Sequence, residues 1–319
     1  TVLDDQIKRG ETSSVAIRFA AAVQKLTVSD FVVQSGTLSG LKSVDGGINW
    51  TAVFTPASNI EDTTNVVSLL AQSVVTTDNK TNIAGTSNNY QVDTKAPLVT
   101  FKIYDSALSL GDSSPVSIKF SEPVTGLTLS DFTVENGSLT DLVQVDSTTW
   151  TAVLWANDNV TDFSNVITLA AGAVTDLAGN ANLLKNSTAF KIDSTRPTAT
   201  LVLADTVLLK GETTVLTVTF SEAIKGLSLS DFVVASGELT NLVQDGVNPL
   251  VYTATFTPTD NLTDTTNSIQ LRTGAVIDSF SNKNLAAKTA GTYKVDTQLP
   301  VASITLASDT LAKDGQTSA

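Results

Sequence analysis

Three occurrences of the triplet Ser-Asp-Phe divide this chain of 319 residues into repeats. The triplet begins at Ser29, Ser130 and Ser230, within the segments KLTVSDFVVQSGTLSGL, GLTLSDFTVENGSLTDL and GLSLSDFVVASGELTNL. Self-similarity at a fixed period of about 100 residues indicates copies of one structural unit. We predict three domains, residues 1–93, 94–193 and 194–296, and assign residues 297–319 to the opening strand of a fourth.

Alternating apolar residues predict that each copy is built from short β-strands. The middle copy contains the runs VTFKIYDS, SPVSIKFSE, TTWTAVLWA, SNVITLAAGAV and STAFKID, with Gly, Asn and Asp turns between them. Around each Ser-Asp-Phe triplet the alternation runs into a Ser-Gly or Asn-Gly pair and resumes, which predicts a β-hairpin. About seven strands in a repeat of this length are typical of an immunoglobulin-like sandwich. The predicted fold class is all-β, with tandem immunoglobulin-like β-sandwiches in a linear rod.

Aromatic residues recur in the fifth strand of each copy. Trp50, Trp150 and Tyr252 occupy equivalent positions, and we expect them to fill the sandwich cores. Trp155 lies on the opposite face from Leu154 by alternation, so we expect it to be exposed.

Composition excludes several classes of function. The chain contains no Cys, Met or His, which removes thiol nucleophiles, imidazole bases, and zinc and haem sites. A glycosidase with paired carboxylates needs two acids flanking one cleft, whereas the acids here recur in every copy. We therefore predict that the chain is not an enzyme. The net charge of −13 argues against nucleic-acid partners, and the sequence has no 18-residue apolar run, so we expect no membrane insertion.

Acidic residues gather in loops that the strand order places at one end of each domain. The candidate metal ligands there are Asp4, Glu11, Asp62 and Asp93 in the first copy, Asp105, Asp112, Asp158, Asp162 and Asp193 in the second, and Asp205, Glu212, Asp260, Asp264 and Asp296 in the third. Converging carboxylates repel one another, so either they are solvated turn residues or a cation holds them. Glu11 and Glu212 replace Asp112, and because Glu forms poor side-chain turns, the retained charge favours a cation. Oxygen ligands without His or Cys select Ca²⁺.

A second acidic set lies in loops predicted at the opposite end of each domain. The segment TDLAGN contains Asp176, and the matching segments contain Asp78 and Asp278. Glu122 and Glu222 follow the second strand in the triplet FSE. Across a short linker these loops should face the acidic end of the preceding domain, where Asp176 and Asp278 could add metal ligands. A plain Asp turn is an equal alternative.

These motifs together resemble the tandem bacterial immunoglobulin-like repeats of giant type I-secreted adhesins. The resemblance rests on the linker DT-x-x-P, the G-[DE] turn, FSE, L-[ST]-L-SDF, GxLT and TDxAGN, and it covers the whole chain. It implies a secreted protein of the bacterial surface whose repeats form a rod that projects a binding tip. It also implies that calcium at the junctions stiffens the rod and that the parent adhesin contacts host cells.

The resemblance and the residues lead to several further expectations. The leading function is a calcium-stiffened spacer, and the alternative is a repeat that itself binds a host glycan or protein through Trp155. Strand lengths predict domains of about 40 Å and a rod of about 120 Å. The partners are adjacent repeats, and the chain should be a monomer. Residues 301–308 should be held by a neighbouring molecule or project as a tail.

Overall fold

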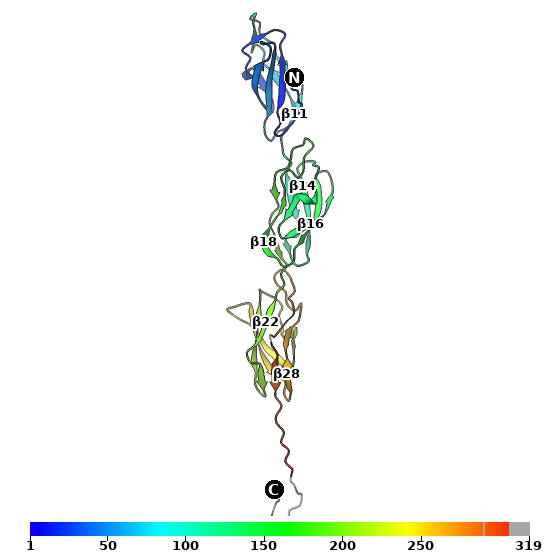
Figure 1. The fold of residues 1–319 in the computed structure, drawn as a ribbon, viewed down its shortest axis with the longest axis vertical. Helices are drawn as coiled ribbons and strands as arrows, with labels where there is room; N and C mark the ends of the chain where they lie inside the picture. The colour runs from blue at the N-terminus through cyan, green and yellow to red at the C-terminus, as the bar shows by residue number, and fades with distance from the viewer. Residues whose placement is uncertain (290, 306–319) are drawn as a thin grey trace, which may run out of the picture. The chain divides into compact units, whose positions relative to one another are not determined.

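The structure is a computed structural model that describes residues 1–289 and 291–305. By its internal contacts the chain forms two units, one of residues 1–192 and one that begins at Asp193. In Figure 1 the chain is coloured from blue at the N-terminus to red at the C-terminus, so each repeat has its own range of colours. The part of the chain that is described contains no helix with the length and apolar character needed to cross a bilayer.

Each repeat consists of short strands with one 3₁₀ turn. In the first repeat these are β1 Gln6–Lys8, β2 Ser13–Arg18, β3 Val23–Gln24, η1 Val28–Asp30, β4 Phe31–Val33, β5 Gly36–Ser43, β6 Asn49–Pro56, β7 Glu61–Asn65, β8 Val67–Leu69, β9 Val75–Thr76, β10 Gly85–Thr86 and β11 Tyr90–Asp93. In the second they are β12 Val99–Ile103, β13 Ala107–Leu108, β14 Ser113–Phe120, η2 Leu129–Asp131, β15 Phe132–Val134, β16 Gly137–Gln144, β17 Thr149–Ala156, β18 Thr161–Asn165, β19 Ile167–Leu169, β20 Lys185–Asn186 and β21 Phe190–Asp193. In the third they are β22 Ala199–Leu203, β23 Val207–Leu209, β24 Thr214–Phe220, η3 Leu229–Asp231, β25 Phe232–Val234, β26 Gly237–Gln244, β27 Val251–Pro258, β28 Thr263–Asn267, β29 Ile269–Leu271, β30 Ala287–Lys288 and β31 Tyr293–Asp296.

The second and third repeats share one strand order. Their larger sheets are β12-β14-β17-β16 and β22-β24-β27-β26, both antiparallel. The other strands form the sheets β13-β21-β18 and β15-β19-β20 in the second repeat, and β23-β31-β28 and β25-β29-β30 in the third. The first repeat has the same layout with a three-stranded larger sheet, β2-β6-β5. The predicted class, tandem all-β immunoglobulin-like sandwiches, is confirmed.

Period-two alternation positions the core as the sequence indicated. Along β14, Val116, Ile118 and Phe120 are buried and their neighbours point outward. Trp150 is buried, and its ring lies edge-on to Phe120 with centroids 5.4 Å apart. The equivalent Trp50 and Tyr252 pack at the edges of their cores. These aromatic residues therefore act as core residues, and Trp155 is 41% exposed as predicted.

The hairpin predicted around each Ser-Asp-Phe triplet is wrong. The triplet closes a 3₁₀ turn, in which the Asp30 carboxylate accepts hydrogen bonds from the backbone N–H and the hydroxyl of Thr27. The strand that follows, β4, pairs with β8, whereas β5 pairs with β6 in the other sheet. The chain crosses between sheets at Ser35, which has a φ of 54°. Strand alternation alone does not show which sheet a strand joins.

The residue at which the chain crosses between the sheets differs among the repeats, and its identity decides whether a buried Asn side chain has a hydrogen-bond donor. In the second repeat it is Asn136, whose Nδ2 donates to Asn165 Oδ1 at 2.8 Å. The first repeat has Ser35 there, and the matching Oδ1 of the fully buried Asn65 has no hydrogen-bond partner among the described residues. An unsatisfied buried acceptor costs free energy, and Asn also tolerates a positive φ better than Ser.

Residues 301–305 form no strand in this structure. The rest of the predicted opening strand, residues 306–308, lies outside the described residues.

Replacing Ser35 with Asn should raise the free energy of unfolding of the first repeat by about 1 kcal/mol, because a donor would reach Asn65 Oδ1. Hydrogen exchange of the full chain, read on peptides that cover β7, measures the change. The reverse substitution, Asn136→Ser, should weaken the second repeat by a similar amount. Equal protection in both variants and the parent would contradict this account of the crossing.

Candidate metal centres

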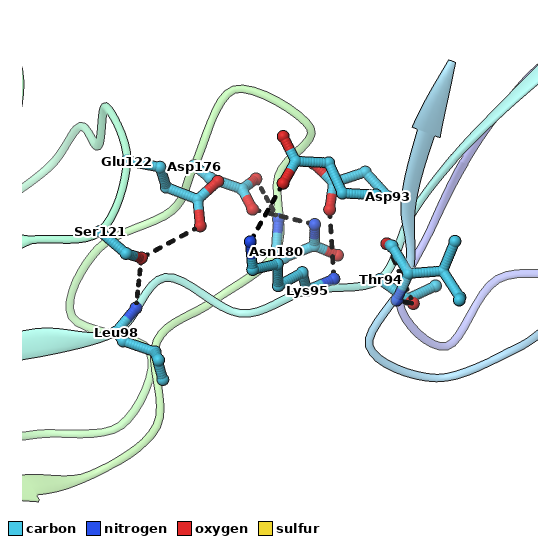
Figure 2. Close-up of polar contacts among 10 residues, drawn as sticks. Asp93, Thr94, Lys95, Leu98, Ser121, Glu122, Asp176 and Asn180 are labelled. Carbon is cyan, nitrogen blue, oxygen red and sulfur yellow. Dashed lines mark hydrogen bonds and ion pairs between the residues drawn. The ribbon is translucent and has the colours of Figure 1, made fainter. Parts of the chain in front are cut away.

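The structure brings three carboxylates together where the first repeat ends and the second begins. Asp93 is the last residue of β11, Glu122 follows β14, and Asp176 lies in the loop between β19 and β20. One oxygen from each carboxylate lies within 4.8 Å of the others. Figure 2 shows the three carboxyl groups turned toward one another. We call this group the first acidic cluster.

Asp176 is fixed by its own loop. It is buried, and its two oxygens accept the backbone N–H of Asn180 at 2.8 Å and the Asn180 Nδ2 at 2.9 Å. Asn180 Oδ1 in turn accepts the backbone N–H of Arg9 at 2.9 Å, so the loop of the second repeat bonds the first. Gly179, with a φ of 90°, lies directly under Lys8, and an added Cβ would come 3.1 Å from Lys8 Nζ. The TDLAGN motif therefore builds the turn, orients the carboxylate and leaves room for the neighbouring repeat.

The linker fixes the other side of the cluster. Asp93 Oδ1 accepts the backbone N–H of Lys95 at 3.1 Å, and the hydroxyl of Thr94 donates to the carbonyl of Ala57 at 2.8 Å. Thr94 also exchanges bonds with the backbone of Ile60. The Asp-Thr pair thus ties the linker to a loop of the first repeat and turns the Asp carboxylate toward the second.

Burial and mutual repulsion make full ionisation of the first acidic cluster unfavourable. Burial raises the pKa of Glu122, and the negative charges of Asp176 and Asp93 raise it further. Burial is also the largest cause that raises the pKa of Asp93, opposed in part by the hydrogen bond from the Lys95 N–H. A bound cation would remove both penalties.

A second acidic cluster, within the unit that begins at Asp193, contains the equivalent residues Asp193, Glu222 and Asp278. Asp193 and Asp278 are buried, and Asp278 accepts the backbone N–H and the Nδ2 of Asn282 at 2.9 and 2.8 Å. Burial, followed by the charges of Asp278 and Asp193, raises the pKa of Glu222 to about 7. The same three positions therefore recur with the same loop chemistry.

Most of the predicted ligands instead accept local hydrogen bonds, either in turns or, for Asp62, Asp162 and Asp264, within the short strands β7, β18 and β28. Asp4, Asp105, Asp205, Asp62, Asp162 and Asp264 each accept the N–H of the residue two positions on, and Glu11, Asp112 and Glu212 accept the N–H three positions back. Bonds from the Ser164 N–H and hydroxyl lower the pKa of Asp162. Asp296 accepts the hydroxyl of Thr263, and Asp158 and Asp260 are exposed. Within residues 1–289 and 291–305, only the two clusters bring three acids within 4.8 Å, so metal binding at the other acids stays a prediction.

The structure also corrects the argument from Glu11 and Glu212. Both side chains accept the N–H three positions back, as Asp112 does. Glu therefore forms this side-chain turn, contrary to the prediction that it forms such turns poorly. Charge conservation at this turn therefore does not point to a cation.

The alignment of Asp78 with Asp176 is wrong by two residues. The N–H of Asn82 donates to the Val74 carbonyl and the Val74 N–H donates to Asn82 Oδ1, and Asn182 and Val174 form the same two bonds. The N–H of Lys80 donates to Thr76 Oγ1 at the place where the N–H of Asn180 donates to Asp176 Oδ1. Thr76 is thus the counterpart of Asp176. Since Ala21 stands where the second repeat has Glu122, the first repeat lacks both acids at this end.

Four of the six cluster residues, Asp93, Asp176, Asp193 and Asp278, are predicted as ligands from the sequence, and Glu122 and Glu222 are not. The signal that could have found them is the FSE triplet, which occurs only in the two repeats that also carry an Asp at the position of Asp176. Glu122 and Glu222 meet the Asp residues of their clusters only because the fold brings together loops that lie far apart in sequence.

Without metal, the stability of the chain should fall as the pH rises through about 7. The folded chain retains a proton on Glu222 that the unfolded chain releases near its ordinary pKa of 4.5. This contribution is fully present below pH 4.5 and is lost above the folded pKa. Thermal melts in EDTA between about pH 5 and pH 8 measure it. Glu222→Gln should flatten the profile, and an unaltered slope in that variant would assign the dependence to other groups.

Comparison with known proteins identifies the repeated unit. The sequence profile of the bacterial Ig-like domain matches residues 1–92, 93–192 and 193–295. No curated protein matches the chain significantly. Similar solved structures include the Escherichia coli adhesin FdeC, at 12% identity over 92% of this chain and 95% of that one, with a TM-score of 0.34. The titin fragment I67–I69 is 11% identical over 91% and 95%, with a TM-score of 0.39, and the mouse nectin-like molecule 4 ectodomain is 11% identical over 93% and 98%, with a TM-score of 0.32. The three family matches cover nearly the whole chain, which therefore belongs to the bacterial Ig-like domain family.

Proposed function

We propose that this chain is a spacer segment of a bacterial surface adhesin whose joints are held by calcium. The observation that supports the proposal is the composition of the first acidic cluster: Asp93 comes from the first repeat, and Glu122 and Asp176 come from the second. A cation bound by all three is held by both repeats at once. Its binding free energy therefore opposes any motion that separates them.

Calcium is the cation that fits this cluster best. The three ligands are carboxylates, and Ca²⁺ accepts six to eight oxygen ligands, water included, in a flexible shell. Transition metals favour imidazole or thiolate, which the chain cannot supply because it has no His or Cys. Mg²⁺ demands a tight octahedral shell and retains its water, so it would be held more weakly.

Recurrence of the cluster supports a mechanical role. The acids Asp193, Glu222 and Asp278 occupy the same positions in sequence one repeat later. An enzyme has no need to repeat its acids along a chain, whereas a spacer gains stiffness from each joint. The adhesin assignment rests on the family and on the resemblance of the linker and loop motifs. It places the protein at the bacterial surface, with adjacent repeats as direct partners and host cells as partners of the parent protein.

The alternative, direct binding of a host ligand by one repeat, has weaker support. Trp155 is exposed, but its Nε1 donates to Thr140 Oγ1 at 3.2 Å on the same sheet. The other repeats have Thr55 and Thr257 at this position. The indole therefore already has a polar partner, and the spacer remains the proposed function.

Removing calcium should loosen the chain before it unfolds the sandwiches. Extracellular calcium modules bind with dissociation constants on the order of 10⁻⁴ to 10⁻³ M. Calcium at a hundredfold excess over that constant would add about 2.7 kcal/mol to the stability of the liganded state. Small-angle scattering in calcium and in EDTA should show a smaller mean radius of gyration after chelation, because a loose joint samples bent arrangements. A radius of gyration that does not depend on calcium would refute the proposed role.

Variants separate the cluster from the turn acids. Glu122→Gln should weaken calcium binding at one site by about tenfold or more, because it removes a charged ligand and keeps the side-chain size. Asp162→Asn is the matched control, since Asp162 lies in β18 of the same repeat and outside the cluster. Isothermal titration measures both. Equal losses of calcium affinity in the two variants would contradict binding at the cluster and favour the other acids predicted from the sequence.

A further inference from the structure

The motif GxLT opens an edge strand of the larger sheet in each repeat, and the acidic clusters do not explain it. It begins β16 as GSLT and β26 as GELT, and β5 begins with the variant GTLS. In their sheets β5, β16 and β26 each have one neighbouring strand, which is β6, β17 or β27. The other side of such a strand is a row of backbone N–H and C=O groups that can pair with the edge of another chain.

Each of these edge strands contains one extra residue directly after the motif. Pairing of β16 with β17 is regular through Thr140 and resumes at Val143. Between them, Asp141 and Leu142 lie opposite the single residue Ala152, which is a β-bulge. Equivalent register shifts lie between Ser39 and Lys42 in β5 and between Thr240 and Val243 in β26.

The extra residue has a left-handed backbone conformation in all three repeats. Asp141 has a φ of 53°, and its counterparts Gly40 and Asn241 have φ values of 59° and 53°. Gly, Asn and Asp are the residues that adopt this conformation at the least cost. Leu139 and Leu142, on either side of the bulge, both pack against the core. Without Asp141 these two leucines would be two residues apart and would still face inward, so the core does not require the bulge.

The edge beside the bulge has residues that favour strand pairing. Val143 and Val243 are 56% and 58% exposed, and Val is a residue that strands prefer. The first repeat has Lys42 at this position, and a Lys on an edge strand opposes pairing by its charge. The second and third repeats lack that charge, so the bulge is the feature that protects their edges.

We propose that the bulge at Asp141 prevents β16 from pairing with the same strand of a second copy, and that the bulge at Asn241 protects β26 in the same way. A bulge bends the strand and increases its twist, so the backbone groups on its outer side do not form one straight row. Without Asp141 the strand would read Leu-Thr-Leu-Val with regular alternation, and two such edges could pair about a twofold axis. The inference concerns the sides of the repeats and requires no metal at the acidic clusters.

A full chain that lacks Asp141 tests the proposal, because the deletion makes β16 regular. The parent chain should remain a monomer in sedimentation equilibrium up to about 1 mM, and the deletion variant should form dimers below that concentration. Hydrogen exchange should show that β16 gains protection in the dimer, while unchanged protection of β14 and β17 shows that the sandwich is folded. A folded deletion variant that stays monomeric, or a parent chain that itself pairs through β16, would overturn the proposal.

Further variants separate the backbone conformation from the side chain. Asp141→Gly removes the carboxylate and keeps the positive φ, so this chain should remain a monomer. Val143→Lys, added to the deletion, should restore the monomer because the added charges repel at the shared edge. If loss of Asp141 unfolds the second repeat, a chain that lacks Asn241 gives the same readout through β26. Dimers of Asp141→Gly as strong as those of the deletion, or dimers of the deletion that persist with Val143→Lys, would contradict protection by the bulge.

Discussion

Repulsion among one buried and two half-buried carboxylates is the interaction on which the joint between the first and second repeats depends. Asp93, Glu122 and Asp176 come from three separate segments, and the fold holds one oxygen of each within 4.8 Å of the others. Burial raises the pKa of Glu122 and of Asp93, so the folded site disfavours the ionised form of both carboxyl groups. Such an arrangement is unfavourable in an isolated chain, and a bound divalent cation would offset the repulsion. Under the proposed function, calcium bound at this cluster would hold the first and second repeats together more firmly.

The surrounding hydrogen bonds hold the three carboxylates in place although their mutual repulsion is unfavourable. Asn180 holds Asp176 with two bonds and reaches Arg9 of the first repeat, while Thr94 anchors the linker to its own repeat. These neutral groups position the charges. The division of roles accounts for the conserved spacing of the motif within the chain, in which Asp176 and Asn180 recur as Asp278 and Asn282.

Much of the fold could be predicted from the sequence because sandwich cores follow a local rule. Alternation identified Trp150 as a core residue and Trp155 as an exposed one, since a strand's inward face is set by its own residues. Which strands pair is set by distant segments, and this is where the hairpin prediction failed: Ser35 takes the chain to the other sheet. The candidate site divides in the same way. Asp93 and Asp176 could be named from their motifs, but the contribution of Glu122 depends on a meeting of loops, and the turn role of Glu11 depends on a bond to Lys8.

The most direct measurement of the central claim is anomalous diffraction from crystals of this chain grown with calcium or a lanthanide. The account predicts an ion bound by carboxylate oxygens of Asp93, Glu122 and Asp176 together, at the distances of about 2.3 to 2.6 Å usual for calcium, and a second at Asp193, Glu222 and Asp278. Ions bound only at acids outside the clusters, such as Asp112 and Asp162, or two clusters that stay empty in millimolar calcium, would contradict it.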